Sequence, residues 1–365
     1  MNRRDFIHAA SVSAASATMP TLTVAQGNRD GRNEPPQLGA KLRTITLEEH
    51  FASPGWFAGP GRDFVERLRN GGPRGMKIFE QLQDVGDGRL AEMDAAGIDV
   101  QVLSLNSPGV EQADAATQIA IARESNDFLA DVVKRNPKRF AAFAALPVSA
   151  PDQAADELEH RVQQQGFKGT LINGHSRARY LDDKFFWPIL ERAESLGVPI
   201  YLHPTVPAKP VADLLYGGFS PAVSGAFEAA GWGWHIETGV HLIRMVLGGV
   251  FDRYPKLQVV IGHLGEGVPF MLERLNRNLP TKLTKLDRPV AAYLRENVHY
   301  TFAGFNFPAT FLDLLLEVGA ERIMFSCDHP YGSMLEARAF LDQVPVTATD
   351  RVRIAHGNAE RLFNL

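Results

Sequence analysis

The sequence predicts one α/β domain built as a (β/α)8 TIM barrel. From Arg43 onward, short β-branched runs alternate with segments of helical period, a pattern typical of βα units and a parallel sheet. Eight such units can be counted, the number that closes a barrel. In addition, residues that commonly bind metals follow several of the strands. An open doubly wound sheet, made of the same units, is the structural alternative.

Eight runs have the composition of buried strands. They cover residues 44–48, 99–104, 140–146, 169–173, 199–203, 257–261, 298–302 and 322–326, the last two being the weakest. Helices are expected at 118–134, 151–166, 181–196 and 309–318. The first ends before Asn136-Pro137, and glycines at or just after the ends of the others supply the usual stop signal. The connections 50–99 and 203–257 are much longer than barrel loops need to be, so we expect them to cover the active site.

Composition limits the function classes. Of the 365 residues, 45% are hydrophobic and 22% are charged, as in ordinary globular proteins. The net charge is -4 with no basic stripe, which argues against a nucleic-acid partner. Cys327 is the one cysteine, so no internal disulfide forms, and we expect a buried apolar side chain rather than a nucleophile.

The first 25 residues read as a twin-arginine (Tat) signal peptide. Arg3 and Arg4 precede an Ala/Ser-rich stretch, and Thr23-Val24-Ala25 offers a small-residue cleavage site. The apolar stretch is too short to span a bilayer. Residues 26–42 form a linker rich in Gly, Pro and charge, and 43–365 form the catalytic domain. We therefore expect a periplasmic protein; the alternative is a tail with two chance arginines.

Candidate metal ligands follow the predicted strands. They are Glu48, His50, His203, His263 and Asp328. In a barrel, functional groups gather where strands end, so these side chains are expected to meet. A lone histidine of this kind is more often structural, and an aspartate often caps the next helix. The coincidence of five favours a metal site.

The first strand determines which carboxylate is a ligand. Glu48 and His50 lie two residues apart, so both side chains point to one face, here the barrel mouth. Glu49 points the other way and is expected outside the ligand set. Imidazole and carboxylate together suit zinc, manganese or iron(II).

Several motifs resemble one family. They are LEEHF at 47–51, LHP at 202–204, FDRYP at 251–255, GHLGEG at 262–267, SCDHP at 326–330 and GNAERLF at 357–363. This set resembles the hydroxybenzoate decarboxylase branch of the amidohydrolase superfamily, typified by the γ-resorcylate (2,6-dihydroxybenzoate) decarboxylases. The resemblance covers about residues 44–363.

The resemblance implies one divalent ion, Zn²⁺ or Mn²⁺, held by Glu48, His50, His203 and Asp328. Most members of the superfamily begin with His-x-His, whereas Glu48 in the first position resembles the decarboxylases. Binuclear members use a carbamylated lysine that ends the fourth strand. Here that strand ends in Asn173-Gly174, and the nearest lysine lies at its start.

The resemblance also implies the chemistry. The substrate would be a small aromatic carboxylic acid with an ortho hydroxyl group. Asp328 would protonate the ring carbon that bears the carboxylate, after which carbon dioxide leaves. His263 and Glu266 are three residues apart, and the carboxylate would orient the imidazole for proton handling.

Substrate contacts are less defined. Arg274 is a candidate for neutralising a substrate anion, and the alternative is a solvated helix arginine. Phe51 and Phe302, with Trp56 and Phe57, are candidates for stacking on an aromatic ring, although core positions are more common for such residues.

Three other histidines receive no ligand role. His235 and His241 are interpreted as helix residues, and His329 remains open.

Two other functions compete. The same metal and aspartate can activate water, which would give a hydrolase or hydratase acting on an ester, lactone or amide. A binding protein without turnover needs no proton-transfer group, so Asp328, His263 and Glu266 argue against it. The family resemblance also suggests a homo-oligomer, either a dimer or a tetramer.

Export offers a direct test of the leader. Replacing Arg3 and Arg4 with lysine should leave the protein folded in the cytoplasm with its leader attached, because a receptor reads this pair. Cell fractionation with immunoblotting measures the outcome. Undiminished periplasmic delivery of the double variant would contradict the Tat assignment.

Overall fold

The structure is a computed structural model that describes residues 42–365. The signal peptide expected at 1–25, and all but the last residue of the linker expected at 26–42, lie outside the described residues. Within 42–365, no helix combines the length and apolar character needed to cross a membrane.

Eight parallel strands form a closed barrel. They are β1 (Ile45–Phe51), β2 (Val100–Leu105), β3 (Phe140–Ala142), β4 (Thr170–Asn173), β5 (Ile200–His203), β6 (Val259–Ile261), β7 (Val298–Thr301) and β8 (Ile323–Met324). Each strand pairs in parallel with the next from β1 to β3 and from β4 to β8. Parallel bridges from Ala144 to Thr170 and from Leu47 to Ser326 join these two sets. The predicted barrel is confirmed, and the open-sheet alternative is wrong.

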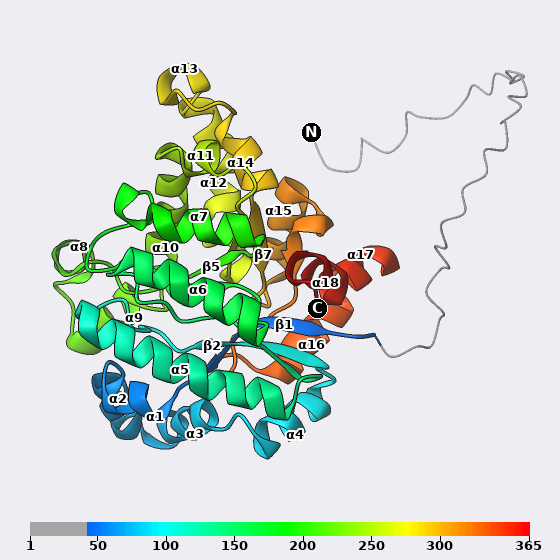
Figure 1. The fold of residues 1–365 in the computed structure, drawn as a ribbon. Coiled ribbons are helices and arrows are strands. Elements are labelled where there is room, and N and C mark those ends of the chain that lie inside the picture. Colours follow the sequence, from blue (N-terminus) through cyan, green and yellow to red (C-terminus); the bar gives the residue numbers. More distant parts are fainter. Residues whose placement is uncertain (1–41) are drawn as a thin grey trace, which may run out of the picture. The chain divides into compact units, whose positions relative to one another are not determined.

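Helices surround the strands (Figure 1). After β1 come α1 (Pro54–Ala58), α2 (Arg62–Asn70), α3 (Gly72–Gln83) and α4 (Asp87–Ala96); α5 (Ala115–Arg135), α6 (Pro151–Gln165) and α7 (Trp187–Leu196) follow the next three strands. After β5 come α8 (Lys209–Tyr216), α9 (Pro221–Glu228), α10 (Gly233–Leu247) and α11 (Val250–Arg253). The chain ends with α12 (Val268–Asn278), α13 (Thr281–Thr284), α14 (Val290–Glu296), α15 (Pro308–Val318), α16 (Met334–Gln343), α17 (Ala348–Val352) and α18 (Asn358–Phe363).

Alternate residues of the strands fill the barrel. The interior contains Ile45, Leu47, Val100, Val102, Ala141, Phe143, Leu171, Tyr201, Val260 and Met324. Their neighbours along each strand pack outward against the helices in a second, larger core. This alternation is the two-residue period of a strand, so it decides which side chains reach the inside.

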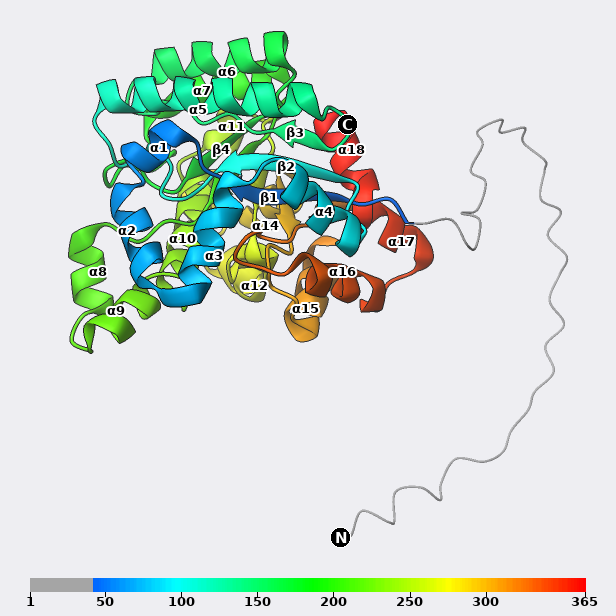
Figure 2. The ribbon, with the colours of Figure 1, turned by 90° about the horizontal axis from the view of Figure 1, so that it is seen from below.

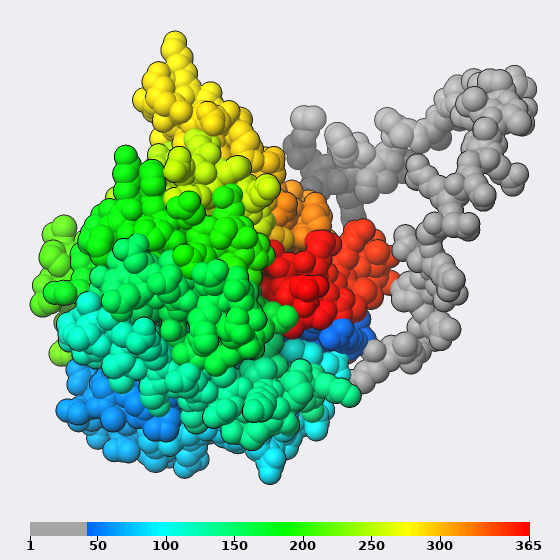
Figure 3. Space-filling model, viewed as in Figure 1, coloured from blue at the N-terminus to red at the C-terminus, as the bar shows by residue number. Residues whose placement is uncertain are grey.

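The two ends of the barrel carry different segments. In Figures 1 and 2, α8 and α9 lie at the left, whereas α17, α18 and the start of β1 lie at the right. Figure 3 shows the red C-terminal helices against the blue start of β1, where Arg43 pairs with Glu360. The strands therefore end on the side of the long insertions after β1 and β5. Both insertions are largely helical rather than the loops expected.

A β-bulge decides which side chains of β1 point into the barrel. Its register against β2 shifts between Thr46 and Glu49, and Glu48 has a left-handed backbone with φ of 63°. Because of this bulge, Leu47 and Glu48 both belong to the inner side, and His50 follows on that side. Without the extra residue, the alternation that places Ile45 and Leu47 inside would have placed Glu49 there.

Some predicted boundaries were wrong. The third and eighth strands are shorter than expected and continue only as the single bridges at Ala144 and Ser326. The helix expected at 181–196 begins at Trp187, since Asp183 caps a separate 3-10 turn and Pro188 occupies the first turn of α7.

The inner core is completed by Phe363 at the end of α18. Phe363 is 4% exposed and its ring centre lies 5.5 Å from that of Phe143 inside the barrel. Phe363→Ala should lower the free energy of unfolding by about 3–5 kcal/mol, because it opens a cavity in a packed interior. Urea titration measures the loss. Leu316→Ala, at a side chain that is 84% exposed on α15, is the control and should change stability by less than about 0.5 kcal/mol. Equal effects of the two changes would contradict this packing.

Candidate metal centre

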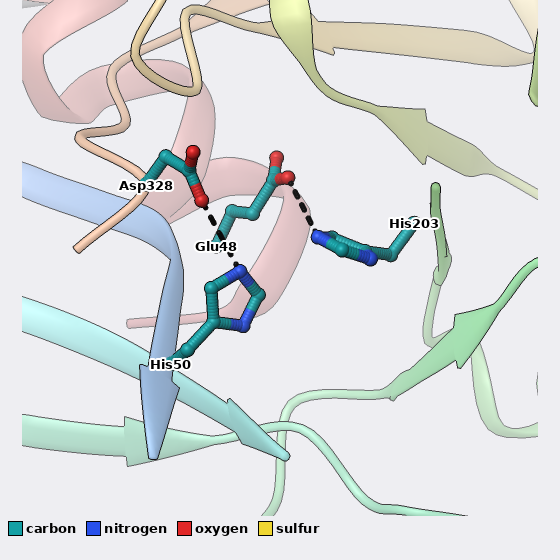
Figure 4. A group of neighbouring side chains, drawn as sticks. All are labelled: Glu48, His50, His203 and Asp328. Carbon is teal, nitrogen blue, oxygen red and sulfur yellow. Dashed lines mark ion pairs between the residues drawn. The ribbon is translucent and has the colours of Figure 1, made fainter. Parts of the chain in front are cut away.

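Four side chains from distant parts of the chain meet at the mouth of the barrel (Figure 4). They are Glu48, His50, His203 and Asp328, and one ligand atom from each lies within 4.8 Å of the others. His50 Nε2 is 3.3 Å from Asp328 Oδ1, and His203 Nε2 is 3.2 Å from Glu48 Oε1. The structure thus brings together the four residues that the sequence predicted as ligands.

The strands explain this meeting. Glu48 lies in the bulge of β1 and His50 just beyond it, and His203 is the last residue of β5. Asp328 follows β8 by four residues, in the loop that lies against β1. All four therefore sit at the end of the barrel toward which the strands run, as barrel active sites do.

Both ligand imidazoles are oriented by contacts to their other nitrogen. His203 Nδ1 lies 2.9 Å from the carbonyl oxygen of Pro204, to which it donates. His50 Nδ1 lies 3.3 Å from Ser104 Oγ. In neutral His203, Nε2 then faces the cluster with its lone pair, which is how such partners prepare histidine for a metal. The Ser104 contact fixes the direction of the His50 ring.

Glu48 provides the test of whether a cation fits. Its carboxyl group is fully buried; Tyr201 donates its hydroxyl hydrogen to Oε2, while Oε1 has no hydrogen-bond partner among the described residues. A buried carboxylate oxygen that accepts no hydrogen bond is costly unless a cation satisfies it. The residues present therefore fit one divalent ion.

Space for Glu48 comes from a glycine. A Cβ placed on Gly262 would lie 2.3 Å from Glu48 Oε2 and 3.1 Å from the Cβ of Ala303. Gly262 directly follows β6, two residues after inward-facing Val260. Any larger residue would displace the carboxylate.

Asp328 is the most accessible of the four. Its side chain is 17% exposed, against 0–6% for the other three. Glu49, pointing away from the cluster as expected, accepts hydrogen bonds from the backbone N–H of Cys327 at 2.8 Å and of His329 at 3.3 Å. These two bonds hold the backbone on both sides of Asp328.

The cluster shifts the proton affinities of its members. Burial and the charge of Glu48 raise the pKa of Asp328 well above its usual value. Burial would also raise the pKa of Glu48, but the positive charge of His263 and contacts with the neighbouring histidines lower it. Burial and the charge of His203 lower the pKa of His50 well below its usual value. Opposed shifts of neighbouring groups are typical of functional sites.

A second group lies beside the first. His263 Nε2 is 3.8 Å from Glu48 Oε1 and 4.0 Å from Asp328 Oδ2, and its Nδ1 is 2.7 Å from Glu266 Oε1. Burial would lower the pKa of His263, but the carboxylates of Glu266 and Glu48 raise it to about 10. The pairing expected of His263 and Glu266 is present.

Four of these residues have unusual backbone conformations. Glu48, His263, Glu266 and Asp328 all have φ between 50° and 63°. Left-handed backbone is uncommon outside glycine and is found at functional sites, where the surrounding packing holds it. The strain supports a constrained site.

The structure does not bring the three predicted substrate contacts to this cluster. Phe51 is 1% exposed and stacks on Phe128, and Phe302 is 0% exposed among other phenylalanines. Arg274 is exposed on α12, which agrees with the alternative that it is a solvated helix arginine. Both aromatic residues belong to the core between barrel and helices.

Three further residues considered in the sequence, Cys327, His241 and His329, are all buried. Cys327 is buried, as expected, and His241 lies inside α10 with Nε2 accepting from the backbone of Leu181. His329 is buried and acts through its backbone, since its carbonyl accepts from His50 N at 2.7 Å.

Sequence reasoning missed two residues. His235 was interpreted only as a helix residue, yet its Nδ1 lies 2.6 Å from Glu266 Oε2. Tyr201, which holds Glu48, lies two residues before His203 on the same strand. Strand alternation could have found Tyr201, whereas His235 carried no local signal.

Comparison with known proteins identifies relatives. A model of the amidohydrolase family matches residues 55–365. A γ-resorcylate decarboxylase from Rhizobium radiobacter is 39% identical, covering 88% of this chain and 98% of its own length.

Two solved structures have the same fold. One is a dihydroxybenzoic acid decarboxylase from Polaromonas sp. JS666 with bound manganese and 2-nitroresorcinol, with 36% identity, a TM-score of 0.80, and coverage of 88% of this chain and 97% of the other. The second is a 5-carboxyvanillate decarboxylase from Novosphingobium aromaticivorans with manganese, with 30% identity, a TM-score of 0.80, and coverage of 88% and 96%.

Metal content tests the cluster. The purified protein should carry about one divalent ion per chain, and His203→Ala or Asp328→Asn should lose most of it, because four ligands share one ion. Elemental analysis measures the ratio. His356→Ala, which changes a histidine paired with Glu360 outside the cluster, is the matched control and should keep its metal. Two ions per chain, or full metal in His203→Ala, would overturn the single-ion site.

Proposed function

The chain belongs to the amidohydrolase family, and on this premise we propose that it is a metal-dependent, non-oxidative decarboxylase of hydroxybenzoate-type aromatic acids. The observation that carries the proposal is the ligand set itself. A carboxylate and an imidazole from β1 join His203 and Asp328 around one position. Homologues with high coverage are γ-resorcylate decarboxylases, and related decarboxylase structures hold manganese.

Each residue of the cluster has a role in this proposal. Glu48, His50, His203 and Asp328 would hold the ion. A divalent ion bound there, which we propose to be Mn²⁺ or Zn²⁺, supplies a Lewis acid and a template for the carboxylate and ortho-hydroxyl oxygens of the substrate. Solved relatives with bound manganese favour Mn²⁺.

Asp328 would deliver the proton. It is the most exposed member of the cluster, so a ring placed at the mouth meets it first. The Asp328 proton forms a C–H bond at the ring carbon that bears the carboxylate. The bond from this carbon to the carboxylate then breaks, its electron pair restores the aromatic ring, and carbon dioxide leaves.

The cycle needs a new proton on Asp328 after each turnover. His263 Nε2 lies 4.0 Å from Asp328 Oδ2, and the Glu266 carboxylate fixes the other nitrogen of that ring. We assign to this pair the handling of protons between Asp328 and solvent. General acid–base residues within reach of each other serve such transfers.

We propose that the protein acts in the periplasm after export by the Tat pathway. Support comes from the sequence of the leader, in which Arg3 and Arg4 precede an Ala/Ser-rich stretch. The leader resembles a Tat signal, and this pathway carries proteins that have already folded. The ion would therefore be loaded before export.

We also propose a homo-oligomer, either a dimer or a tetramer. Large apolar side chains are exposed on and around α8 and α9, among them Leu214 at 82%, Leu215 at 57% and Phe219 at 59%. Contiguous exposed apolar surface on a protein commonly marks an interface.

Decarboxylation itself is the decisive measurement. With a panel of hydroxybenzoates, including 2,6-dihydroxybenzoate, the protein should release carbon dioxide, and a chelator should stop it. Asp328→Asn should lose several orders of magnitude in turnover, more than its reduced metal content explains. In deuterated water, one deuteron should appear at the vacated ring carbon.

A control separates proton handling from metal binding. His263→Asn should retain the ion but lose most of its turnover, because His263 is adjacent to the cluster rather than part of it. Normal turnover in a metal-replete His263→Asn protein would remove this residue from the mechanism. Cleavage of an ester, lactone or amide, with no carbon dioxide from any hydroxybenzoate, would favour the hydrolase alternative.

A further inference from the structure

His235 comes from the long insertion after β5, at the first turn of α10, and reaches the polar group beside the metal ligands. We infer that His235 is a positioning residue for the proposed decarboxylation: through Glu266 it fixes the ring of His263 toward Asp328. This inference rests on the proposed function and adds a third member to the His263–Glu266 pair.

Each carboxylate oxygen of Glu266 is hydrogen-bonded to one histidine. Its Oε1 lies 2.7 Å from His263 Nδ1, and its Oε2 lies 2.6 Å from His235 Nδ1. All three residues are buried, with side-chain exposures of 0% for Glu266, 6% for His263 and 11% for His235. Within residues 42–365, no other side chain donates to this carboxylate.

The hydrogen positions follow from the carboxylate. Burial would raise the pKa of Glu266, but the neighbouring histidines lower it to about 2, so the group is ionised. An ionised carboxylate only accepts hydrogen bonds, so both Nδ1 atoms must donate. The consequence for His263 is a single ring orientation, with Nε2 directed at Glu48 and Asp328.

His235 is itself held in place. The indole N–H of Trp234 donates to its Nε2 at 3.1 Å. Its ring centre is 4.6 Å from that of His263 and 5.0 Å from that of Phe305. Such fixed contacts make His235 a rigid support. Without it, one oxygen of Glu266 loses its donor and the carboxylate is free to turn away from His263.

A matched pair of variants isolates the hydrogen bond. Asparagine places an amide N–H near the position of Nδ1, whereas glutamine places it near Nε2. His235→Asn should keep turnover within about threefold, and His235→Gln should lose about 10–100-fold in kcat, the usual effect of removing such an outer partner. KM and metal content should stay unchanged in both. Equal kcat values for the two variants would overturn the inference.

A double-mutant cycle separates positioning from packing. If His235 acts through Glu266, then His235→Gln should have little further effect on kcat in a Glu266→Gln background. A purely structural role would instead give losses that multiply. Multiplying losses would therefore overturn the inference.

A spectroscopic measurement is independent of turnover. In protein labelled with ¹⁵N-histidine, the Nδ1–H of His263 should give a hydrogen-bonded downfield proton signal in the wild type and in His235→Asn, and a shifted or broadened one in His235→Gln. An unaltered signal in His235→Gln would overturn the inference. Absence of carbon dioxide from the wild-type protein would refute the proposed function alone, since this signal still reports on the arrangement of the three residues.

Discussion

The contact between β1 and the loop after β8 is the constraint on which both the fold and the site depend. The bridge from Leu47 to Ser326 closes the barrel, and His50 N donates to His329 O beyond it. Glu49 adds two hydrogen bonds to the backbone around Asp328. The same contact therefore completes the cylinder and places two β1 ligands beside Asp328, which lies 278 residues after His50 in the 365-residue chain.

Backbone strain is concentrated where this contact and β6 meet the site. Left-handed conformations at Glu48, His263, Glu266 and Asp328 each cost on the order of 1–2 kcal/mol for a residue other than glycine. They persist because the barrel core and the closing hydrogen bonds leave the chain no alternative path. At Glu48 the result is a side chain turned inward, next to the space that Gly262 leaves open. The packing of the barrel thus maintains four strained backbone conformations, and these conformations set the directions of the four side chains.

The sequence was informative where local patterns decide the structure. Strand period and glycine stops predicted the barrel, and strand-end positions predicted five candidates. The family resemblance then implied four of them, Glu48, His50, His203 and Asp328, as the ligand set. The bulge at Glu48 was not visible, because it is a shift in the pairing of β1 with β2, which the sequence of one strand does not display. His235 was missed for a related reason: its partner Glu266 lies 31 residues away and is reached only through tertiary packing. Phe51 and Phe302 were wrongly offered as substrate contacts. An aromatic residue close in sequence to a metal ligand can equally belong to the hydrophobic core, and both residues do.

The segment from Ser326 to Phe363 matters to how the barrel forms. Phe363 and Ala359 complete the inner core, and Ser326 provides the partner of β1. During synthesis, β1 through β7 emerge before either is available, so the growing chain exposes the unpaired edges of β1 and β7. Such edges readily pair with other chains. Until β8 and the segment after it have emerged, the chain lacks the fourth ligand, Asp328, and the partners that cover these edges, so the unfinished barrel is the form of this protein most prone to association.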